Sequence, residues 1–288
     1  DRSRGLGDVY KRQVNGIFTL GSSGEVAFST DARREEIIRA AIDIVDGRVP
    51  VFVGCIDTET NRVIEHARQA RELGASAIVA TAPFYALGGM AEVERHFRLI
   101  HEAVPDLPLF AYDIPVCVHT KLPGDMLVRL GLDGVLAGVK DSSNDDVSFR
   151  FLVDDNNKAG HPLTLLTGQE VVVDGAYMAG ADGSVPGLAN VEATAYVRMW
   201  NAYRKGDWGS VRTEQDKMAA LMRTPASYRV CRGSAPASAH SRRRSRCSAS
   251  SIRTRCPIRS RRSPARTSNA SPRCLRTADC RSLARRSK

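Results

Sequence analysis

The chain has 288 residues, enough for one large α/β domain or two small ones, and its 42% hydrophobic content is sufficient to build a core. Its formal net charge of +10 is unevenly distributed, because residues 225–288 hold 17 arginines and one lysine against a single aspartate. That segment carries +17, whereas residues 1–224, with 24 basic and 31 acidic side chains, carry −7. The overall basic charge is therefore a property of residues 225–288 and gives no evidence for a nucleic-acid groove in the larger, acidic part.

Short apolar runs alternate with longer amphipathic ones between residues 14 and 223. Residues 1–13 show neither pattern and are predicted to be a non-native leader. The short runs predict strands at 16–20, 50–55, 76–81, 107–112, 134–140, 163–167 and 183–185. The amphipathic runs predict helices at 31–45, with Asp31 as its cap, and at 58–73, 91–103, 123–130, 146–156, 170–178, 191–204 and 207–222.

Repeated strand-helix units of this kind predict a parallel α/β fold. Seven units with short strands favour a (β/α)₈ TIM barrel that is one unit short of eight. An open doubly wound sheet is the alternative, but no G-x-G-x-x-G sequence follows any predicted strand. The 14–223 region is therefore predicted to be a partial TIM-barrel domain.

Residues 224–288 show no periodicity. Positions 225–288 contain only six of the larger apolar residues, too few to offset chain entropy, so we predict a disordered tail. Its mixture of Arg, Ser, Pro, Ala and Cys is what a shifted reading frame of a GC-rich gene would encode. A basic arm for nucleic acid is the alternative, but such an arm normally interleaves aromatic residues. We predict a frameshifted tail and no nucleic-acid partner.

The cysteines indicate a reducing compartment. Five of the seven lie in the tail, which leaves Cys55 and Cys117 in the body, with no spacing typical of zinc or disulfide sites. No apolar run approaches the ~20 residues that a membrane span requires. We therefore predict a cytoplasmic protein with no membrane partner.

The run L-A-G-V-K-D-S-S at 136–143 brings Lys140 to the end of a buried strand. Poor solvation of the ammonium should lower its pKa there, which makes a lysine an amine nucleophile. The alternative is a strand-end lysine that pairs with Asp141 or points to water. Tyr112 ends the 107–112 strand in the same way, and Ser22 and Ser23 follow the 16–20 strand, so a barrel would gather these side chains at one face.

These residue types together point to imine chemistry. Lys140 can condense with a ketone to give an imine, an electron sink for the adjacent C–C bond, while Tyr112 moves protons. The turn 21–24, placed before a helix and supplied with serine hydroxyls, would hold a carboxylate. Taken singly, the turn could be an ordinary connection and the tyrosine a packed aromatic residue.

Five motifs carry a resemblance to a known family: G-S-S-G-E at 21–25, P-F-Y at 83–85, Y-D-I-P at 112–115, G-V-K-D-S-S at 138–143 and G-A-D-G-S-V-P-G-L-A-N at 180–190. Over residues 14–223 the chain resembles the dihydrodipicolinate synthase and N-acetylneuraminate lyase family of pyruvate-dependent class I aldolases. The resemblance implies that Lys140 is the Schiff-base lysine, Tyr112 the proton-transferring tyrosine and Ser22 the relay hydroxyl. It implies that Tyr85 reaches into a neighbouring subunit's site.

For substrate binding, the resemblance implies that Ser23 holds the pyruvate carboxylate and that Gly168 and Val185 lie beside the keto acid. It implies pyruvate and an aldehyde as substrates, a homo-oligomer (dimer or tetramer), and no cofactor or metal. The six histidines show no ligand spacing, which agrees with the lack of a metal. Family members have a strand and helix before position 16 and two or three helices beyond 222, so the barrel is expected to lack its first strand-helix unit and its usual C-terminal helices.

One departure from the family concerns substrate choice. In the synthases an arginine two residues after the Y-N-x-P proline grips the aldehyde's carboxylate, whereas this chain has Cys117 there, and a thiol cannot replace a bidentate guanidinium. This favours an aldolase or dehydratase for 2-keto-3-deoxy sugar acids. Dihydrodipicolinate synthesis, a neuraminate-type lyase, a non-catalytic keto-acid-binding barrel and an inactive fragment stay as alternatives. His119 and Lys121 are either contacts for a sugar-acid partner or a loop histidine and an exposed lysine.

Overall fold

The structure is a computed structural model and describes residues 13–226. The predictions of a leader at 1–13 and a tail at 224–288 lie outside these residues except at their inner edges, and stay predictions. At the C-terminal edge the last described helix continues to Ala226, beyond the end predicted for it at 222.

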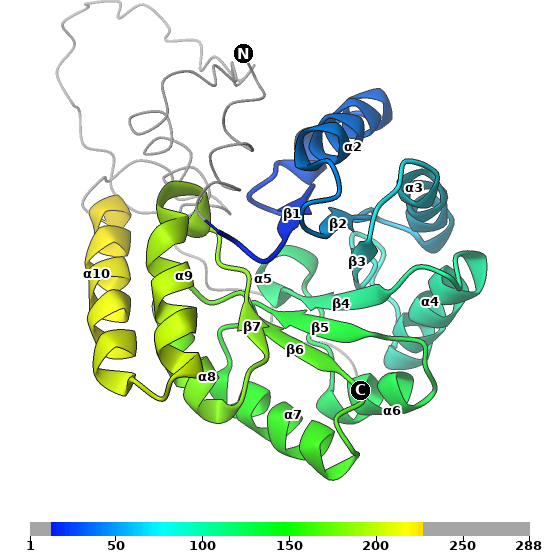
Figure 1. Ribbon diagram of the computed structural model, residues 1–288. Helices are drawn as coiled ribbons and strands as arrows, with labels where there is room; N and C mark the ends of the chain where they lie inside the picture. The colour runs from blue at the N-terminus through cyan, green and yellow to red at the C-terminus, as the bar shows by residue number, and fades with distance from the viewer. Residues whose placement is uncertain (1–12, 227–288) are drawn as a thin grey trace, which may run out of the picture. The chain divides into compact units, whose positions relative to one another are not determined.

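Seven parallel strands form one sheet, in which each strand pairs with the next in sequence (Figure 1). They are β1 (Ile17–Thr19), β2 (Val51–Gly54), β3 (Ala77–Thr81), β4 (Leu109–Asp113), β5 (Gly138–Asp141), β6 (Thr164–Thr167) and β7 (Gly183–Ser184). Within the described residues β1 and β7 are the two ends of the sheet. The number, order and direction of the predicted strands are confirmed, and the strands form a partial barrel.

Helices follow the strands on the outside of the curved sheet (Figure 1). They are α2 (Asp31–Val45), α3 (Thr60–Glu72), α4 (Met90–Ala103), α6 (Gly124–Leu132), α7 (Asp146–Lys158), α8 (Val173–Ala179), α9 (Ala189–Arg204) and α10 (Trp208–Ala226). Two short elements were not predicted, the 3₁₀ turn η1 (Val26–Phe28) and the single-turn helix α5 (Pro115–Val118).

The start of α2 corrects one prediction. Thr30, not Asp31, is the cap, because the Thr30 side chain accepts a hydrogen bond from the Arg33 N–H at 3.3 Å. Asp31 is the first helical residue, where a negative charge favours the positive end of the helix dipole. Both residue types can cap a helix, and the extended backbone of Thr30 decides between them.

Strand register aligns two of the predicted site residues, Tyr112 and Lys140, with their neighbours in the sheet. Thr81, Tyr112, Lys140 and Leu166 are Cα partners across β3 to β6, so their side chains share one face of the sheet. Lys140 and Leu166 line a cavity on the inner face of the barrel, which assigns the whole row to that face. The next residues along the strands, Asp113 and Asp141 among them, point outward.

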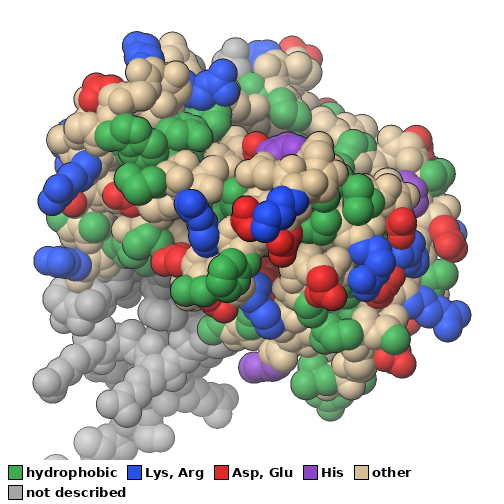
Figure 2. All heavy atoms as spheres, turned by 90° about the horizontal axis from the view of Figure 1, so that it is seen from below, with side chains coloured by type: hydrophobic (Ala, Val, Ile, Leu, Met, Phe, Trp, Pro, Cys, Tyr) green, Lys and Arg blue, Asp and Glu red, His purple; other side chains and the backbone are tan. Residues whose placement is uncertain are grey.

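On the face drawn in Figure 2, lysine and arginine side chains lie among aspartates and glutamates, with no broad area of a single sign. None of the described helices is long and apolar enough to cross a membrane. The predicted cytoplasmic location stays a prediction.

Candidate active site

Lys140 lies in β5 with 9% of its surface exposed. Its Nζ is 4.2 Å from the ring centroid of Tyr112 and 4.7 Å from that of Phe18. Aromatic faces attract a cation and replace part of the hydration that burial removes. The structure thus places the amine and the predicted proton-transferring tyrosine side by side.

The alternative interpretation, a lysine paired with Asp141, is wrong. Successive strand residues face opposite sides, and Asp141 points outward, where its Oδ1 accepts hydrogen bonds from the N–H and hydroxyl of Ser143, both at 2.8 Å. Among the described residues, no carboxylate oxygen lies within 4.0 Å of the Lys140 ammonium. The amine is therefore held by aromatic packing and not by an ion pair.

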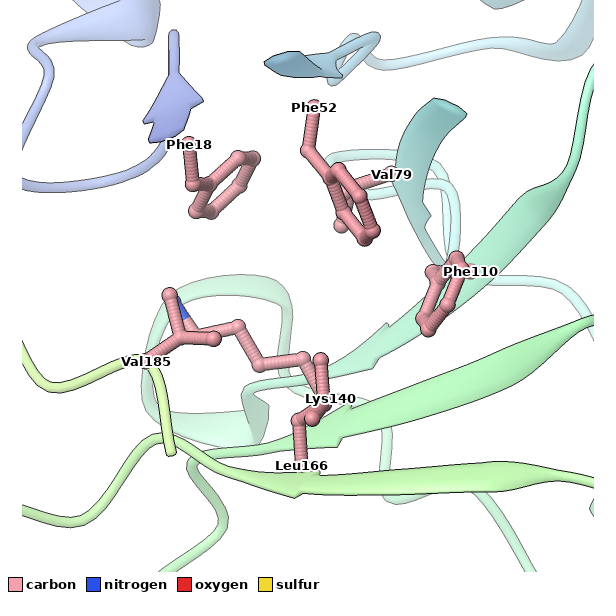
Figure 3. Close-up of a pocket in the computed structure, with 7 residues that line it drawn as sticks. All are labelled: Phe18, Phe52, Val79, Phe110, Lys140, Leu166 and Val185. Carbon is pink, nitrogen blue, oxygen red and sulfur yellow. The ribbon is translucent and has the colours of Figure 1, made fainter. Parts of the chain in front are cut away.

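A cavity of about 20 Å³ adjoins the lysine, room for roughly one water molecule. In Figure 3 the Lys140 side chain extends from β5 toward Val185, facing the rings of Phe18 and Phe52. Six of the seven lining side chains are apolar, so the amine stands at the edge of a dry space. The lining residues are Phe18, Phe52, Val79, Phe110, Lys140, Leu166 and Val185.

Gly168 follows β6 and borders the lysine directly. A Cβ atom at this position would stand 1.9 Å from Ser142 Oγ and 3.0 Å from Lys140 Cε. Only glycine fits here without displacing Ser142 or Lys140. The structure therefore brings Gly168 and Val185, two predicted substrate-binding positions, to Lys140.

Ser23 lies against the loop after β7. A Cβ atom on Gly187 would stand 2.8 Å from Ser23 Oγ and 2.7 Å from Glu170 Oε1, so the hydroxyl and this carboxyl are close neighbours. Burial raises the pKa of Glu170, while a hydrogen bond from the Leu188 N–H and the attraction of the Lys140 ammonium oppose that shift.

Glu170 was not predicted as a site residue. Its position in the sequence could have identified it. Glu170 lies two residues after Gly168, at the carboxyl end of a strand, where barrel enzymes carry their reacting groups. Its backbone is fixed from two helices, because its carbonyl accepts hydrogen bonds from Tyr196 Oη at 2.9 Å and Gln215 Nε2 at 3.2 Å.

Ser22 is exposed beside β1 and lies close to Cys117 in α5; burial raises the pKa of the Cys117 thiol, and the Ser22 side chain partly opposes that shift. The turn precedes α2, which starts at Asp31 as predicted, and the 3₁₀ turn η1 lies between the two. The turn closes on itself, with the N–H groups of Glu25 and Val26 bonded to the carbonyls of Ser22 and Gly21. Any carboxylate bound here would depend on serine groups and not on a helix dipole.

Tyr85 lies in the loop between β3 and α4, and 94% of its surface is exposed. Its φ of 80° is in the left-handed region, which is uncommon for a residue with a Cβ atom. The structure thus turns this side chain to the surface, apart from the buried group around Lys140.

The contacts of Lys121 and His119 do not place either side chain on the inner face of the barrel. The Lys121 ammonium is bound to Asp113 on the outer face, and His119 is exposed with a left-handed φ of 58°. Within residues 13–226, no three His, Cys, Asp or Glu side chains are grouped as metal ligands would be.

Comparisons with known proteins identify the family and agree with the fold. The sequence profile of the Dihydrodipicolinate synthetase family matches residues 9–232. An uncharacterized DapA-like lyase of Halobacterium salinarum is 36% identical over 218 residues, which cover 74% of this chain and 69% of the relative. The putative 2-dehydro-3-deoxy-D-gluconate aldolase YagE of Escherichia coli is 30% identical over 204 residues, 70% of this chain and 67% of the relative.

The crystal structure of YagE in complex with pyruvate matches with a TM-score of 0.74 and 26% identity, covering 78% of this chain and 75% of that chain. A 4-hydroxy-tetrahydrodipicolinate synthase of Phenylobacterium zucineum is 29% identical over 208 residues, 72% of this chain and 69% of the relative. Because the family profile spans most of the sequence, the chain belongs to the dihydrodipicolinate synthetase family.

Proposed function

We propose that this protein is a class I aldolase that uses Lys140 to form a Schiff base with a 2-keto acid. The observation that carries the proposal is the position of the Lys140 amine, buried at a strand end and 4.2 Å from the ring of Tyr112. An amine in an apolar site is a nucleophile suited to carbonyl carbons.

In the cleavage direction, Lys140 Nζ attacks C2 of the keto acid and the carbinolamine loses water to give a protonated imine. The C3–C4 bond then breaks, its electrons pass into the imine, and an aldehyde leaves. Protonation of the enamine at C3 and hydrolysis return pyruvate and the free amine. Tyr112 is the nearest candidate for moving protons to and from the reacting oxygens, with Ser22 as the relay hydroxyl.

The aldehyde partner is proposed to be rich in hydroxyl groups. Cys117 offers no cation for a second carboxylate, and Glu170 beside Ser23 would repel one if ionised. A carboxyl and a serine hydroxyl can both bond to sugar hydroxyls. Relatives named as aldolases for 2-dehydro-3-deoxy sugar acids, with 27% and 30% identity, support the same choice.

The exposed Tyr85 supports a homo-oligomer. A tyrosine that is 94% exposed in a left-handed conformation is costly for a monomer and useful at a contact between subunits. We propose that it completes the proton relay of a neighbouring copy, as the family resemblance implies.

The test is a paired assay of the purified protein. Pyruvate release is measured from 2-keto-3-deoxy sugar acids of five and six carbons, and pyruvate consumption is measured with an aldehyde that carries its own carboxylate. Release from a sugar acid that is lost in Lys140→Ala supports the proposal. Turnover of the carboxylated aldehyde alone would assign the synthase reaction instead, and binding of pyruvate without turnover of any substrate would indicate a non-catalytic barrel.

A further inference from the structure

The outer face of β4 and β5 holds a second pair of strand-end residues, directly behind the catalytic pair. Asp113 follows Tyr112 and Asp141 follows Lys140, and the two aspartates are Cα partners in the parallel ladder. Their side chains are 0% and 4% exposed. Two carboxylates are thus buried side by side where the two reactive side chains leave the sheet.

Two buried neighbouring anions disfavour one another. Burial raises the pKa of both groups, and the charge of Asp141 raises the pKa of Asp113 further. Hydrogen bonds satisfy one oxygen of each, since Leu122 N–H donates to Asp113 Oδ1 at 3.2 Å and the Ser143 groups donate to Asp141 Oδ1. The other oxygen of each faces one shared cation.

That cation is Lys121, a half-buried residue in the loop between α5 and α6. Its Nζ binds Asp113 Oδ2 and lies 3.7 Å from Asp141 Oδ2. In the described part of the chain it is the only basic group within 4.0 Å of either carboxylate. One ammonium therefore links the ends of β4 and β5 and fastens the loop to both.

The same loop follows α5, which holds Cys117 close to Ser22 beyond β1. It carries the Leu122 N–H that donates to Asp113. Loss of the Lys121 ammonium would leave two buried anions without a counter-ion, and their repulsion would separate the strand ends and loosen the loop.

We propose that Lys121 is a positioning residue, whose ammonium bridges Asp113 and Asp141 and thereby fixes the spacing of Tyr112 and Lys140. It touches no substrate and acts through the strands. This inference rests on the proposed function, because the spacing matters only if the two inner side chains act on one reacting centre.

The test compares kcat and KM for pyruvate release in Lys121→Met and in the unaltered protein. Because a displacement of about 1 Å costs roughly 100-fold in rate, we expect kcat to fall about 100-fold while KM changes by roughly threefold or less. Lys121→Arg keeps the bridging charge and is expected to retain most of the activity. Lys158→Met is the matched control, since Lys158 pairs with Asp154 at the C-terminal end of α7, away from the strand ends that carry the site.

A second variant restores the charge balance. Lys121→Met combined with Asp113→Asn leaves a single buried carboxylate. We expect the kcat of this double variant to be about tenfold higher than that of Lys121→Met alone. If Lys121→Met does not fold, the double variant and Lys121→Arg are compared with the unaltered protein instead. A folded double variant whose kcat equals that of the unaltered protein would overturn the inference.

Equal kcat values in Lys121→Met and the unaltered protein would overturn the positioning role, as would a lower melting temperature with unchanged kcat in the folded fraction. Failure of the proposed function has a different signature, because the unaltered protein itself would then release no pyruvate.

Discussion

Two of the buried charged residues, Asp57 and Lys140, have opposite kinds of surroundings. Asp57, just beyond β2, is bound by Arg62 Nε at 2.9 Å and by His66 Nε2 at 3.0 Å, with Arg34 at 3.7 Å. Lys140 in β5 meets two aromatic rings and has no ion pair within the described residues.

The difference separates a structural charge, Asp57, from the charge proposed to be reactive, Lys140. The ligands of Asp57 come from α2 and α3, so this carboxylate joins two helices to the sheet and is fully occupied. The Lys140 amine keeps its lone pair or proton available, because rings attract a cation without accepting a strong hydrogen bond. We expect substitution at Asp57 to reduce stability and substitution at Lys140 to reduce activity.

The largest effect is expected from Lys140→Met, which keeps the apolar stem and removes the amine. Activity should fall by at least about 1000-fold, since no other group can form the imine. The melting temperature should stay the same or rise, because methionine carries no charge and its burial therefore has no cost of desolvating an ion. Enzyme assay and calorimetry check the two parts, and a large loss of stability would mean that Lys140 is structural.

Asp57→Asn should cost about 3 kcal/mol in the free energy of unfolding, because Arg34 and Arg62 lose their shared counter-ion. The pKa of Asp57 lies well below its usual value, owing to bonds from Arg62 and His66 that outweigh burial. Its stabilisation is therefore present above pH 4 and is lost as the pH falls further. Urea unfolding should show the two proteins converging in acid, and a gap that persists there would contradict this account.

Gly168→Ala should reduce activity by roughly 30-fold, because the new Cβ displaces either Ser142 or Lys140. Adding Ser142→Ala removes the 1.9 Å clash but leaves the 3.0 Å approach to Lys140 Cε. We expect the double variant to regain stability without regaining activity. Recovery of both would show that Gly168 matters only for packing.

His96 gives the smallest effect, and it depends on pH. Burial lowers its pKa to about 4, while its ring bonds Thr60 Oγ1 at 3.0 Å and the Thr81 carbonyl at 3.1 Å. Because the unfolded chain binds the proton more tightly, stability is complete above pH 6.5 and falls by about 2 kcal/mol between pH 7 and pH 5. In His96→Gln this slope should flatten, as measured by urea unfolding, and an unchanged slope would exclude His96 as its source.

The sequence was sufficient to predict the strand-helix alternation and the position of Lys140, because both depend on local apolar runs. A predicted strand boundary was wrong where one apolar run covers both the strand and the turn before it. The strand predicted to start at 134 starts at Gly138, since the N–H groups of Val135 and Leu136 bond back to the Leu130 carbonyl. A four-residue helix such as α5 is too short to show a period.

The role of Lys121 could not be predicted, because its two partners lie 8 and 20 residues away and meet only across neighbouring strands. The same holds for Glu170 and Ser23, which come together only through the loop at Gly187. These contacts depend on the register of neighbouring strands and on how the loops meet, which the composition of the sequence does not reveal. The sequence indicated which residue types end each strand, but not which outward-facing side chain would bind which.

The most direct test of the imine mechanism is peptide mass spectrometry after treatment with pyruvate and borohydride. The account predicts a reduced pyruvate adduct on the peptide that contains Lys140, absent from Lys140→Met, with no adduct on the exposed Lys158. A folded protein that gains no adduct, or that gains it equally on surface lysines, would contradict the account.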